Sequence, residues 1–251
     1  MVLRVIIRNV KLSWREKYST RKRQLLQKEG KMANSSEKCC IVIGAGDLTI
    51  GNINRGEEDL VIAVDGGLSY CSVLEIEPDI IIGDFDSVNE KERQAIDILK
   101  EQVPDRVIEL KPEKDDTDML AALKLGLEWG FRSFRIYAGT GGRLDHTLAN
   151  IQCLLYLKNQ GAQGYLCDAN SMTFVMKDEE VRFQPGMEGY LSLFSLGKEA
   201  KEVSIRGMKY PLDHYTMKND FPIGISNEFI GEQGVITVED GELVGIVQYV
   251  G

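Results

Sequence analysis

Asp79-Ile80-Ile81-Ile82-Gly83-Asp84-Phe85-Asp86-Ser87 is the stretch that decides the fold, because an apolar run ends here in two carboxylates one residue apart. Branched apolar residues between turn residues predict a strand buried on both faces, as in a parallel sheet. Ligands of open α/β sheets bind beyond the carboxyl ends of the strands, where Asp84 and Asp86 emerge. This position suits a hard cation with oxygen ligands, such as Mg²⁺. The alternative is a solvated loop in which Ser87 caps the next helix.

Further apolar segments alternate with helical ones along the first two thirds of the chain. Strands are predicted at residues 38–44, 60–67, 107–110 and 133–138. Helices are predicted at residues 68–74, 89–102 and 119–129, and in a segment that runs to about Asn159. The predicted class is therefore α/β, with a doubly wound, mostly parallel sheet and helices on both faces. Beyond Gly161, short alternating segments replace helical periodicity and predict a smaller all-β sandwich.

We predict three regions, namely a basic extension over residues 1–37, an α/β domain over 38–168 and a β-sandwich over 169–251. The first 31 residues hold ten Lys/Arg and two Glu. They are interpreted as a dispensable extension, with a transit segment or a start at Met32 as alternatives. The remaining chain has 20 basic and 37 acidic residues. This acidity argues against a nucleic-acid partner but is compatible with a nucleotide held through metal ions.

Cysteine usage and hydropathy indicate the compartment. The five cysteines form no CxxC pair, and their odd number favours free thiols in a reducing cytoplasm. No apolar run approaches the length of a membrane span, and no secretory signal is expected. We therefore expect a cytoplasmic protein without a membrane partner.

Acids also follow other predicted strands. Asp65 ends the second strand before two glycines, and Asp115, Asp116 and Asp118 precede the helix at 119–129. Each of these acids could cap a helix, since carboxylates suit helix N-termini. Three acids nevertheless exceed what one cap requires. A ligand-facing role therefore stays open beside the capping one.

A glycine-rich turn over residues 139–142 precedes Arg143, Asp145 and His146. Such a turn exposes backbone N–H groups to an anion, and the Arg143 guanidinium suits phosphate. His146 could equally be an ordinary surface residue of the helix. The Gly44-Ala45-Gly46 turn lacks the third glycine of a dinucleotide fingerprint, so it predicts only a strand-end turn whose backbone approaches a phosphate.

Four blocks together resemble the thiamine pyrophosphokinase (thiamine diphosphokinase) family. They are Gly83–Ser87, Lys114–Asp118, Gly141–His146 and the pair Ser226-Asn227, which alone would read as simple turn residues. The likeness covers Lys38 to the C-terminus. It implies an α/β domain followed by a β-sandwich, and a homodimer with active sites at the subunit interface. The implied reaction is transfer of the pyrophosphoryl group of ATP to the hydroxyethyl oxygen of thiamine, giving thiamine diphosphate and AMP.

The resemblance also implies roles for individual residues. Asp84, Asp86 and Asp118 would hold Mg²⁺, and Asp65, Asp115, Asp116, Lys114 and Arg143 would bind ATP. Asp145 would orient or deprotonate the thiamine hydroxyl. Ser226 and Asn227 would contact the vitamin from the β domain of the partner subunit, and Tyr210 stands near the place where relatives often carry a tryptophan.

Two other functions are compatible with these motifs. One is a related diphosphokinase that acts on another alcohol, such as a pterin. The other is a non-catalytic nucleotide or thiamine sensor that kept the fold. The intact set of carboxylates argues against the sensor, because binding alone would need fewer acids around a metal.

Overall fold

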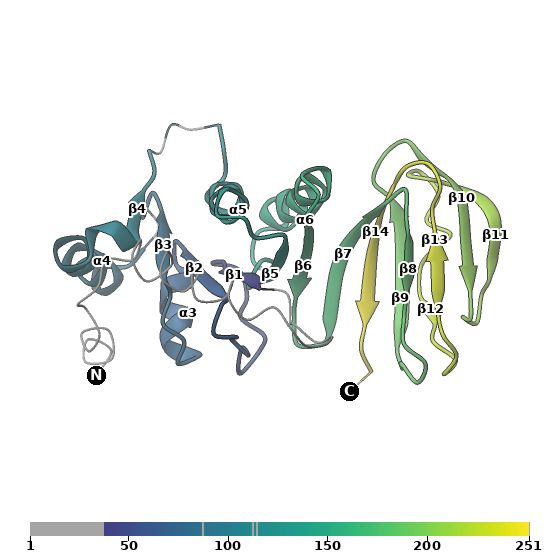
Figure 1. Ribbon diagram of the computed structural model, residues 1–251, viewed down its shortest axis with the longest axis horizontal. Helices are drawn as coiled ribbons and strands as arrows, with labels where there is room; N and C mark the ends of the chain where they lie inside the picture. The colour runs from purple at the N-terminus through teal and green to yellow at the C-terminus, as the bar shows by residue number, and fades with distance from the viewer. Residues whose placement is uncertain (1–37, 87, 112, 114, 251) are drawn as a thin grey trace, which may run out of the picture.

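The computed structural model describes residues 38–86, 88–111, 113 and 115–250. Figure 1 shows an elongated molecule with a helix-covered sheet at one end and a two-layered β structure at the other. The predicted extension over residues 1–37 lies outside the described residues, as do Ser87 and Lys114. No helix within the described residues is long and apolar enough to cross a membrane.

Six parallel strands form the first part of the main sheet. Their order is β6-β5-β1-β2-β3-β4, and every neighbouring pair is parallel. The strands are β1 (Cys39–Ile43), β2 (Leu60–Val64), β3 (Ile80–Gly83), β4 (Val107–Glu109), β5 (Ser133–Tyr137) and β6 (Gln163–Cys167). Every residue of β1, β2 and β3 is buried, as the continuous apolar runs predict. The chain lays β2, β3 and β4 on one side of β1 and then returns to place β5 on the other side. This reversal makes the carboxyl ends of β1 and β5 the topological switch point.

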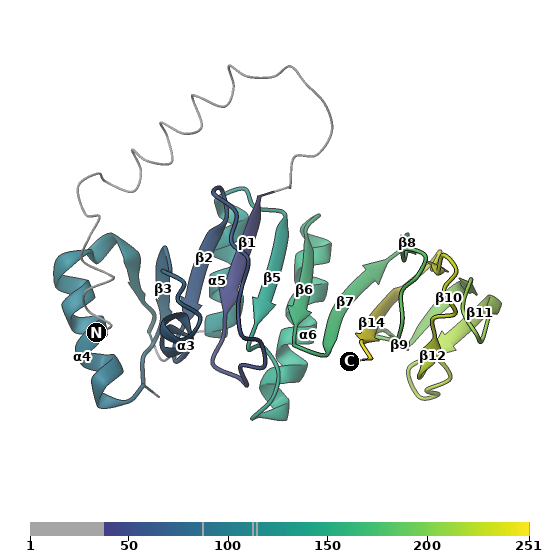
Figure 2. The same ribbon diagram turned by 90° about the horizontal axis from the view of Figure 1, so that it is seen from below.

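Helices cover both faces of these strands (Figure 2). They are α3 (Gly67–Val73), α4 (Glu90–Gln102), α5 (Asp118–Glu128) and α6 (Leu144–Asn159), with a 3₁₀ turn at Pro104–Arg106. Alternate strand residues face opposite cores because side chains of a strand alternate in direction. Ile41 and Ile43 pack with residues of α3 and α4, whereas Cys40 and Val42 pack with residues of α5 and α6. The predicted doubly wound arrangement is confirmed.

The main sheet continues into the β-rich half without a break. Strand β6 pairs in antiparallel fashion with β7 (Ser171–Lys177), and β14 (Glu242–Gln248), β9 (Tyr190–Ser195) and β12 (Asn227–Glu228) follow. A second sheet contains β11 (Leu212–Lys218), β10 (Glu199–Arg206), β13 (Val235–Thr237) and β8 (Glu180–Arg182). The two sheets enclose their own apolar core, so the predicted sandwich is confirmed. Residue 168, the predicted boundary, lies in the connection between β6 and β7.

Candidate active site

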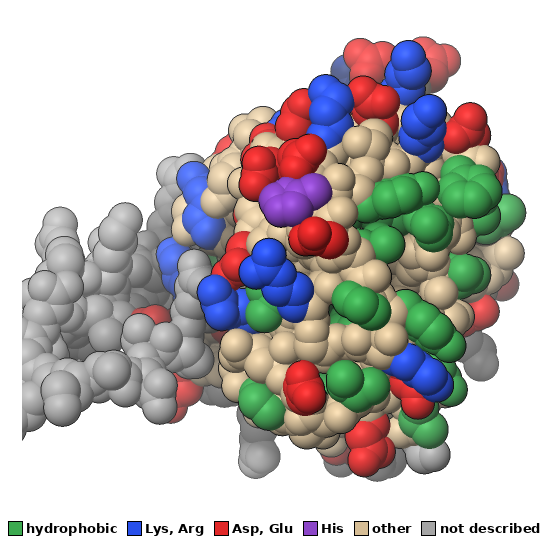
Figure 3. Space-filling model, turned by 90° about the vertical axis from the view of Figure 1, so that its right-hand side faces the viewer, with side chains coloured by type: hydrophobic (Ala, Val, Ile, Leu, Met, Phe, Trp, Pro, Cys, Tyr) green, Lys and Arg blue, Asp and Glu red, His purple; other side chains and the backbone are tan. Residues whose placement is uncertain are grey.

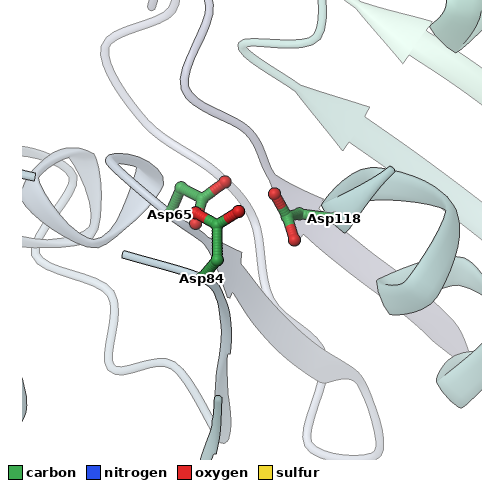
Figure 4. Close-up of side chains that lie close together, drawn as sticks. All are labelled: Asp65, Asp84 and Asp118. Carbon is green, nitrogen blue, oxygen red and sulfur yellow. The ribbon is translucent and has the colours of Figure 1, made fainter. Parts of the chain in front are cut away.

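Three carboxylates meet at the carboxyl ends of the parallel strands. Asp65 follows β2, Asp84 follows β3, and Asp118 is the first residue of α5. One oxygen of each side chain lies within 4.8 Å of the others, and all three residues are half-buried. Figure 4 shows the three side chains pointing toward one another. The edge of the sheet predicted to hold a ligand therefore carries a convergent set of oxygen ligands.

Gly83, the last residue of β3, is needed for this convergence. A Cβ atom at Gly83 would lie 1.8 Å from Asp65 Oδ1, a distance that no side chain can tolerate. Asp65 itself has φ of 47° and donates its backbone N–H to the Ile82 carbonyl oxygen at 3.0 Å. The missing side chain of Gly83 thus makes room for the Asp65 carboxylate across the end of the neighbouring strand.

Phe85 separates the two acids that follow β3. Its ring is buried at 1% exposure, its φ is 57°, and its carbonyl oxygen accepts a hydrogen bond from Arg93. With this side chain in the core, Asp84 is half-buried in the acidic group, whereas Asp86 is exposed. Asp84 Oδ1 accepts a hydrogen bond from the Asp86 backbone N–H at 3.2 Å. Asp65 thus occupies the third place in the group, where the sequence predicted Asp86, and a metal contact of Asp86 stays a prediction.

Burial and mutual repulsion disfavour the ionised form of the acidic group unless a proton or a cation is bound. Burial, followed by the hydrogen bond and charge of Asp118 and the charge of Asp84, raises the pKa of Asp65 to about 7. The Oδ1 atom of Asp65 is buried and has no hydrogen-bond partner among the described residues. Three carboxylates with a buried oxygen of this kind fit a hard divalent cation. A bound cation would relieve the repulsion that otherwise favours a proton on Asp65.

Helix capping falls to residues other than these acids. Thr117 Oγ1 accepts the backbone N–H of Leu120 at 3.1 Å and so caps α5. Asn89 caps α4 through a reciprocal pair of bonds with Glu92, at 2.9 and 3.1 Å. The alternative in which Ser87 caps a helix concerns a residue outside the described residues, within which Asn89 makes the α4 cap. Because Thr117 supplies the α5 cap, the side chain of Asp118 is left to the acidic group.

The other acids before α5 lie outside the group. Asp116 accepts two hydrogen bonds of 2.7 Å from Lys124 Nζ on α5, and Asp115 is exposed. Lys114 lies outside the described residues. The predicted ATP contacts of these three residues stay predictions.

The turn between β5 and α6 presents Arg143 and Asp145 as an ion pair. Arg143 Nη2 lies 2.6 Å from Asp145 Oδ2, and Nε lies 3.2 Å from Oδ1. The two side chains are 72% and 64% exposed. The hydrogen bonds from Arg143 hold the pKa of Asp145 below its usual value, which makes this carboxylate a weaker base. His146 is also exposed, and its backbone N–H donates to Asp145 Oδ1.

The Gly44-Ala45-Gly46 turn is used to join the carboxyl ends of β1 and β5. The backbone N–H groups of Gly44, Gly46 and Asp47 donate to the carbonyl oxygens of Tyr137, Ala138 and Thr140 at 2.8–2.9 Å. A Cβ atom at Gly46 would lie 2.2 Å from the Thr140 carbonyl oxygen, so the glycine permits this close approach. These three N–H groups therefore serve the turn itself, and an approach of this backbone to a phosphate stays a prediction.

The predicted vitamin-contacting residues lie at the other end of the molecule. Strand β12, which begins with Asn227, is at the sandwich edge of the main sheet, far from the ends of β2 and β3 (Figures 1 and 2). Ser226 is exposed with φ of 55°, and its N–H donates to Ser192 Oγ at 3.0 Å. Tyr210 is 60% exposed. Within one chain, the structure does not bring these residues to the acidic group.

Asn227 is buried and engaged with the backbone of Tyr210. Its Oδ1 accepts the Tyr210 N–H at 2.9 Å, and its Nδ2 donates to the Tyr210 carbonyl oxygen at 2.7 Å. These bonds hold Tyr210 beside β12. A direct contact of the amide with thiamine stays a prediction, and it would have to compete with these bonds.

Two kinds of residue at this site lie outside the sequence predictions. The space that Gly83 leaves for Asp65 depends on the packing of neighbouring strands, which the sequence of one strand does not show. Asp168 follows β6 as Asp65 follows β2, so a polar residue directly after a parallel strand is the signal that identifies it. Thr140 lies within the glycine-rich turn and carries no separate signal.

Comparison with known proteins assigns both halves of the chain. Residues 55–166 match the family described as "Thiamin pyrophosphokinase, catalytic domain", and residues 176–243 match "Thiamin pyrophosphokinase, vitamin B1 binding domain". The thiamine pyrophosphokinase of Bacillus subtilis is 31% identical over 191 residues, which cover 76% of this chain and 87% of that protein.

Solved structures agree with this match. The crystal structure of the Bacillus subtilis thiamine pyrophosphokinase aligns with a TM-score of 0.75 and 28% identity, over 84% of this chain and 99% of that one. The thiamin pyrophosphokinase from Geobacillus thermodenitrificans aligns with a TM-score of 0.73 and 26% identity, over 85% and 98%. The chain therefore belongs to the thiamine pyrophosphokinase family.

Proposed function

We propose that this protein transfers the pyrophosphoryl group of ATP to thiamine, giving thiamine diphosphate and AMP. The observation that carries the proposal is the convergence of Asp65, Asp84 and Asp118 at the ligand edge of the sheet, in a chain of this family. In the reaction, the hydroxyethyl oxygen of thiamine forms a bond to the β-phosphorus of ATP. The bond between that phosphorus and the oxygen it shares with the α-phosphorus breaks, and AMP leaves with this oxygen. The hydroxyl proton passes to solvent.

We propose Mg²⁺ as the cation of the acidic group, held by Asp65, Asp84 and Asp118. The fit rests on three oxygen donors within 4.8 Å and on the buried Oδ1 of Asp65. When bound, Mg²⁺ neutralises phosphate charge and so favours the charge distribution of phosphoryl transfer. The acids themselves would fix the position of the nucleotide relative to the sheet edge.

Arg143 and Asp145 would act on the two substrates as a pair. The guanidinium offers donors to phosphate oxygens, and its high exposure leaves it open to a ligand. Asp145 would accept a hydrogen bond from the thiamine hydroxyl and orient it. The lowered pKa of Asp145 supports orientation more than proton removal, since a good base needs a pKa closer to the working pH.

We propose that the protein works as a homodimer in which the β12 region of a second copy completes the site. Ser226 and Tyr210 are remote from the acids of their own chain, so only another copy can bring them there. Around β12 the surface is unusually apolar, and hydrophobic side chains gather on this end of the molecule (Figure 3). The exposed apolar residues there, which we call the β12 patch, are Tyr190, Tyr210, Phe221, Ile223, Ile225 and Ile230. Leu144 and Leu148 at the start of α6, beside Arg143, are also exposed and offer a matching apolar surface.

We also infer that the protein works in the reducing cytoplasm. All five cysteines are free thiols, and Cys39, Cys40, Cys71 and Cys153 are buried. Burial raises the pKa of Cys71 to about 12 and that of Cys153 to about 11, so these thiols are unreactive core residues.

An acceptor assay tests the proposed substrate. The purified chain is incubated with ATP and Mg²⁺, and with thiamine or a hydroxymethyl pterin as the acceptor alcohol. Mass analysis should show thiamine diphosphate formed in step with AMP, and no diphosphate ester of the pterin. Preference for the pterin would support the competing diphosphokinase reading, and consumption of neither alcohol would support a sensor.

A further inference from the structure

A second carboxylate junction lies at the same edge of the sheet, beyond β5 and β6. Asp168 directly follows β6. The Thr140 hydroxyl donates to its carboxylate, and both carboxylate oxygens lie 2.9 Å from Thr140 Oγ1. The hydroxyls of Thr49 and Ser171 approach the same carboxylate at 3.4 Å. Thr49 Oγ1 in turn accepts the backbone N–H of Ala169 at 3.0 Å. One half-buried side chain therefore joins the segments that follow β1, β5 and β6.

Thr140 connects this junction to the glycine-rich turn. Its carbonyl oxygen accepts the Asp47 N–H at 2.8 Å, and two residues later the turn reaches Gly142. Gly141 and Gly142 have φ of 80° and 58°, which glycine adopts without strain, and both are exposed. In its first half, Asn150 Nδ2 donates to the Gly139 carbonyl oxygen at 2.6 Å, and Asp168 accepts from Thr140.

We propose that Asp168 is a positioning residue of the ATP site, which fixes the Gly139–Gly142 turn through Thr140 and so sets where Arg143 meets phosphate. This inference rests on the proposed function for the identity of the ligand. A turn that binds an anion through backbone N–H groups and a following arginine must hold those donors in place before the ligand arrives. Hydrogen bonds to a carboxylate are stronger than neutral ones, which suits Asp168 to that task.

Hydroxyl removal at Thr140 tests the proposal. Thr140→Val keeps the shape of the side chain and removes the donor, whereas Thr140→Ser keeps the donor. We expect Thr140→Val and Asp168→Ala each to raise the KM for ATP by about tenfold, with the KM for thiamine within about twofold, because a hydrogen bond to a charged group is lost. Thr140→Ser should stay close to the wild type. The double variant should be no worse than the more severe single one, because both changes remove the same Thr140–Asp168 hydrogen bond.

Several results would overturn the proposal. A KM for ATP within about twofold of wild type in both variants would do so, as would a loss of thermal stability with unchanged KM values. Thr237→Val, on β13, is the matched control for losing a threonine hydroxyl elsewhere.

A further readout keeps the test independent of turnover. If the wild type makes no AMP from ATP and thiamine, the proposed function fails, and the turn is then examined by amide hydrogen exchange in the peptide 139–147. Faster exchange in Thr140→Val but not in Thr140→Ser supports the positioning role. Equal exchange in both variants and the wild type contradicts it.

Discussion

Phe85 determines how the two carboxylates beside it are used. Phe85 is buried with φ of 57°, and the aspartates on either side of it differ: Asp84 belongs to the acidic group, whereas Asp86 is exposed. The pattern of two acids one residue apart predicted a ligand site at the sheet edge where three carboxylates converge, and the metal itself stays a prediction. Which acids form the group depends on the backbone at Phe85 and on the missing side chain of Gly83, and the spacing of the acids alone does not encode these features.

Gly83→Ala should inactivate the enzyme without changing any acid. The new methyl group would occupy the space of Asp65 Oδ1, displace that carboxylate and lower kcat by on the order of 10²-fold. Steady-state kinetics would measure the loss of kcat, and isothermal titration with MgATP would measure the effect of the displaced carboxylate on binding. Gly51→Ala is the control, because a Cβ atom there would meet nothing within 4 Å. Wild-type turnover in Gly83→Ala would show that the position of Asp65 is unimportant.

Asp65 should make the stability of the metal-free protein depend on pH. Its folded-state pKa of about 7 is above the usual aspartate value of 3.8, so the folded state binds a proton more tightly than the unfolded state. The resulting stabilisation is present in full below pH of about 4 and is lost as the pH rises through about 7. Thermal unfolding in EDTA should therefore show that the Tm of the wild type falls between pH 5 and 8 relative to the Tm of Asp65→Asn.

Magnesium supplies the control for this pH dependence. Saturating Mg²⁺ should keep Asp65 ionised and remove the difference between wild type and Asp65→Asn in the pH slope of Tm. Identical pH slopes for the two proteins in EDTA would contradict the burial-driven shift of the Asp65 pKa.

At the scale of elements, apolar periodicity located the strands and helices of the α/β half because each buried strand is a continuous apolar run. In the sandwich, the alternating segments do not indicate β8, β11 and β12. Strand β11 alternates imperfectly and has only one buried residue, Met217, and β8 and β12 have only three and two residues. Such strands are defined by pairing partners distant in the sequence, so local patterns do not reveal them.

Alanine substitutions at Asn227 and Ser226 should distinguish a structural role from a ligand-binding role at the start of β12. Asn227→Ala leaves the Tyr210 N–H and carbonyl without their partners and should destabilise the fold by about 2 kcal/mol. Ser226→Ala should change stability by less than about 0.5 kcal/mol but raise the KM for thiamine. Urea unfolding and steady-state kinetics measure the two quantities. The assignment fails if Asn227→Ala leaves the unfolding free energy unchanged.

At the scale of the whole molecule, one ten-stranded sheet connects the acidic group to the β12 patch. This continuity keeps the two surfaces apart in one chain and presents both to a second copy. The sequence resemblance implied a site at a subunit interface, but the separation of β12 from the ends of β2 and β3 is visible only in three dimensions (Figure 1).

A charge in the β12 patch should disrupt the proposed dimer. Ile225 is 60% exposed in a single chain, and Ile225→Asp would place a carboxylate in the apolar interface. Light scattering after size-exclusion chromatography should report a dimer for the wild type and a monomer of reduced activity for the variant. Val73→Asp on α3, at a residue of 69% exposure in the α/β half, is the control and should remain dimeric. A monomeric, fully active wild type would refute the interface proposal.

Rapid-quench product analysis over a single turnover is the most direct test of the central claim. The enzyme is mixed with MgATP and thiamine, and the nucleotide and thiamine products are quantified by mass spectrometry. Attack at the β-phosphorus predicts AMP and thiamine diphosphate in equal amounts from the earliest time point, and little of either with Asp118→Asn. ADP accompanied by thiamine monophosphate would contradict pyrophosphoryl transfer.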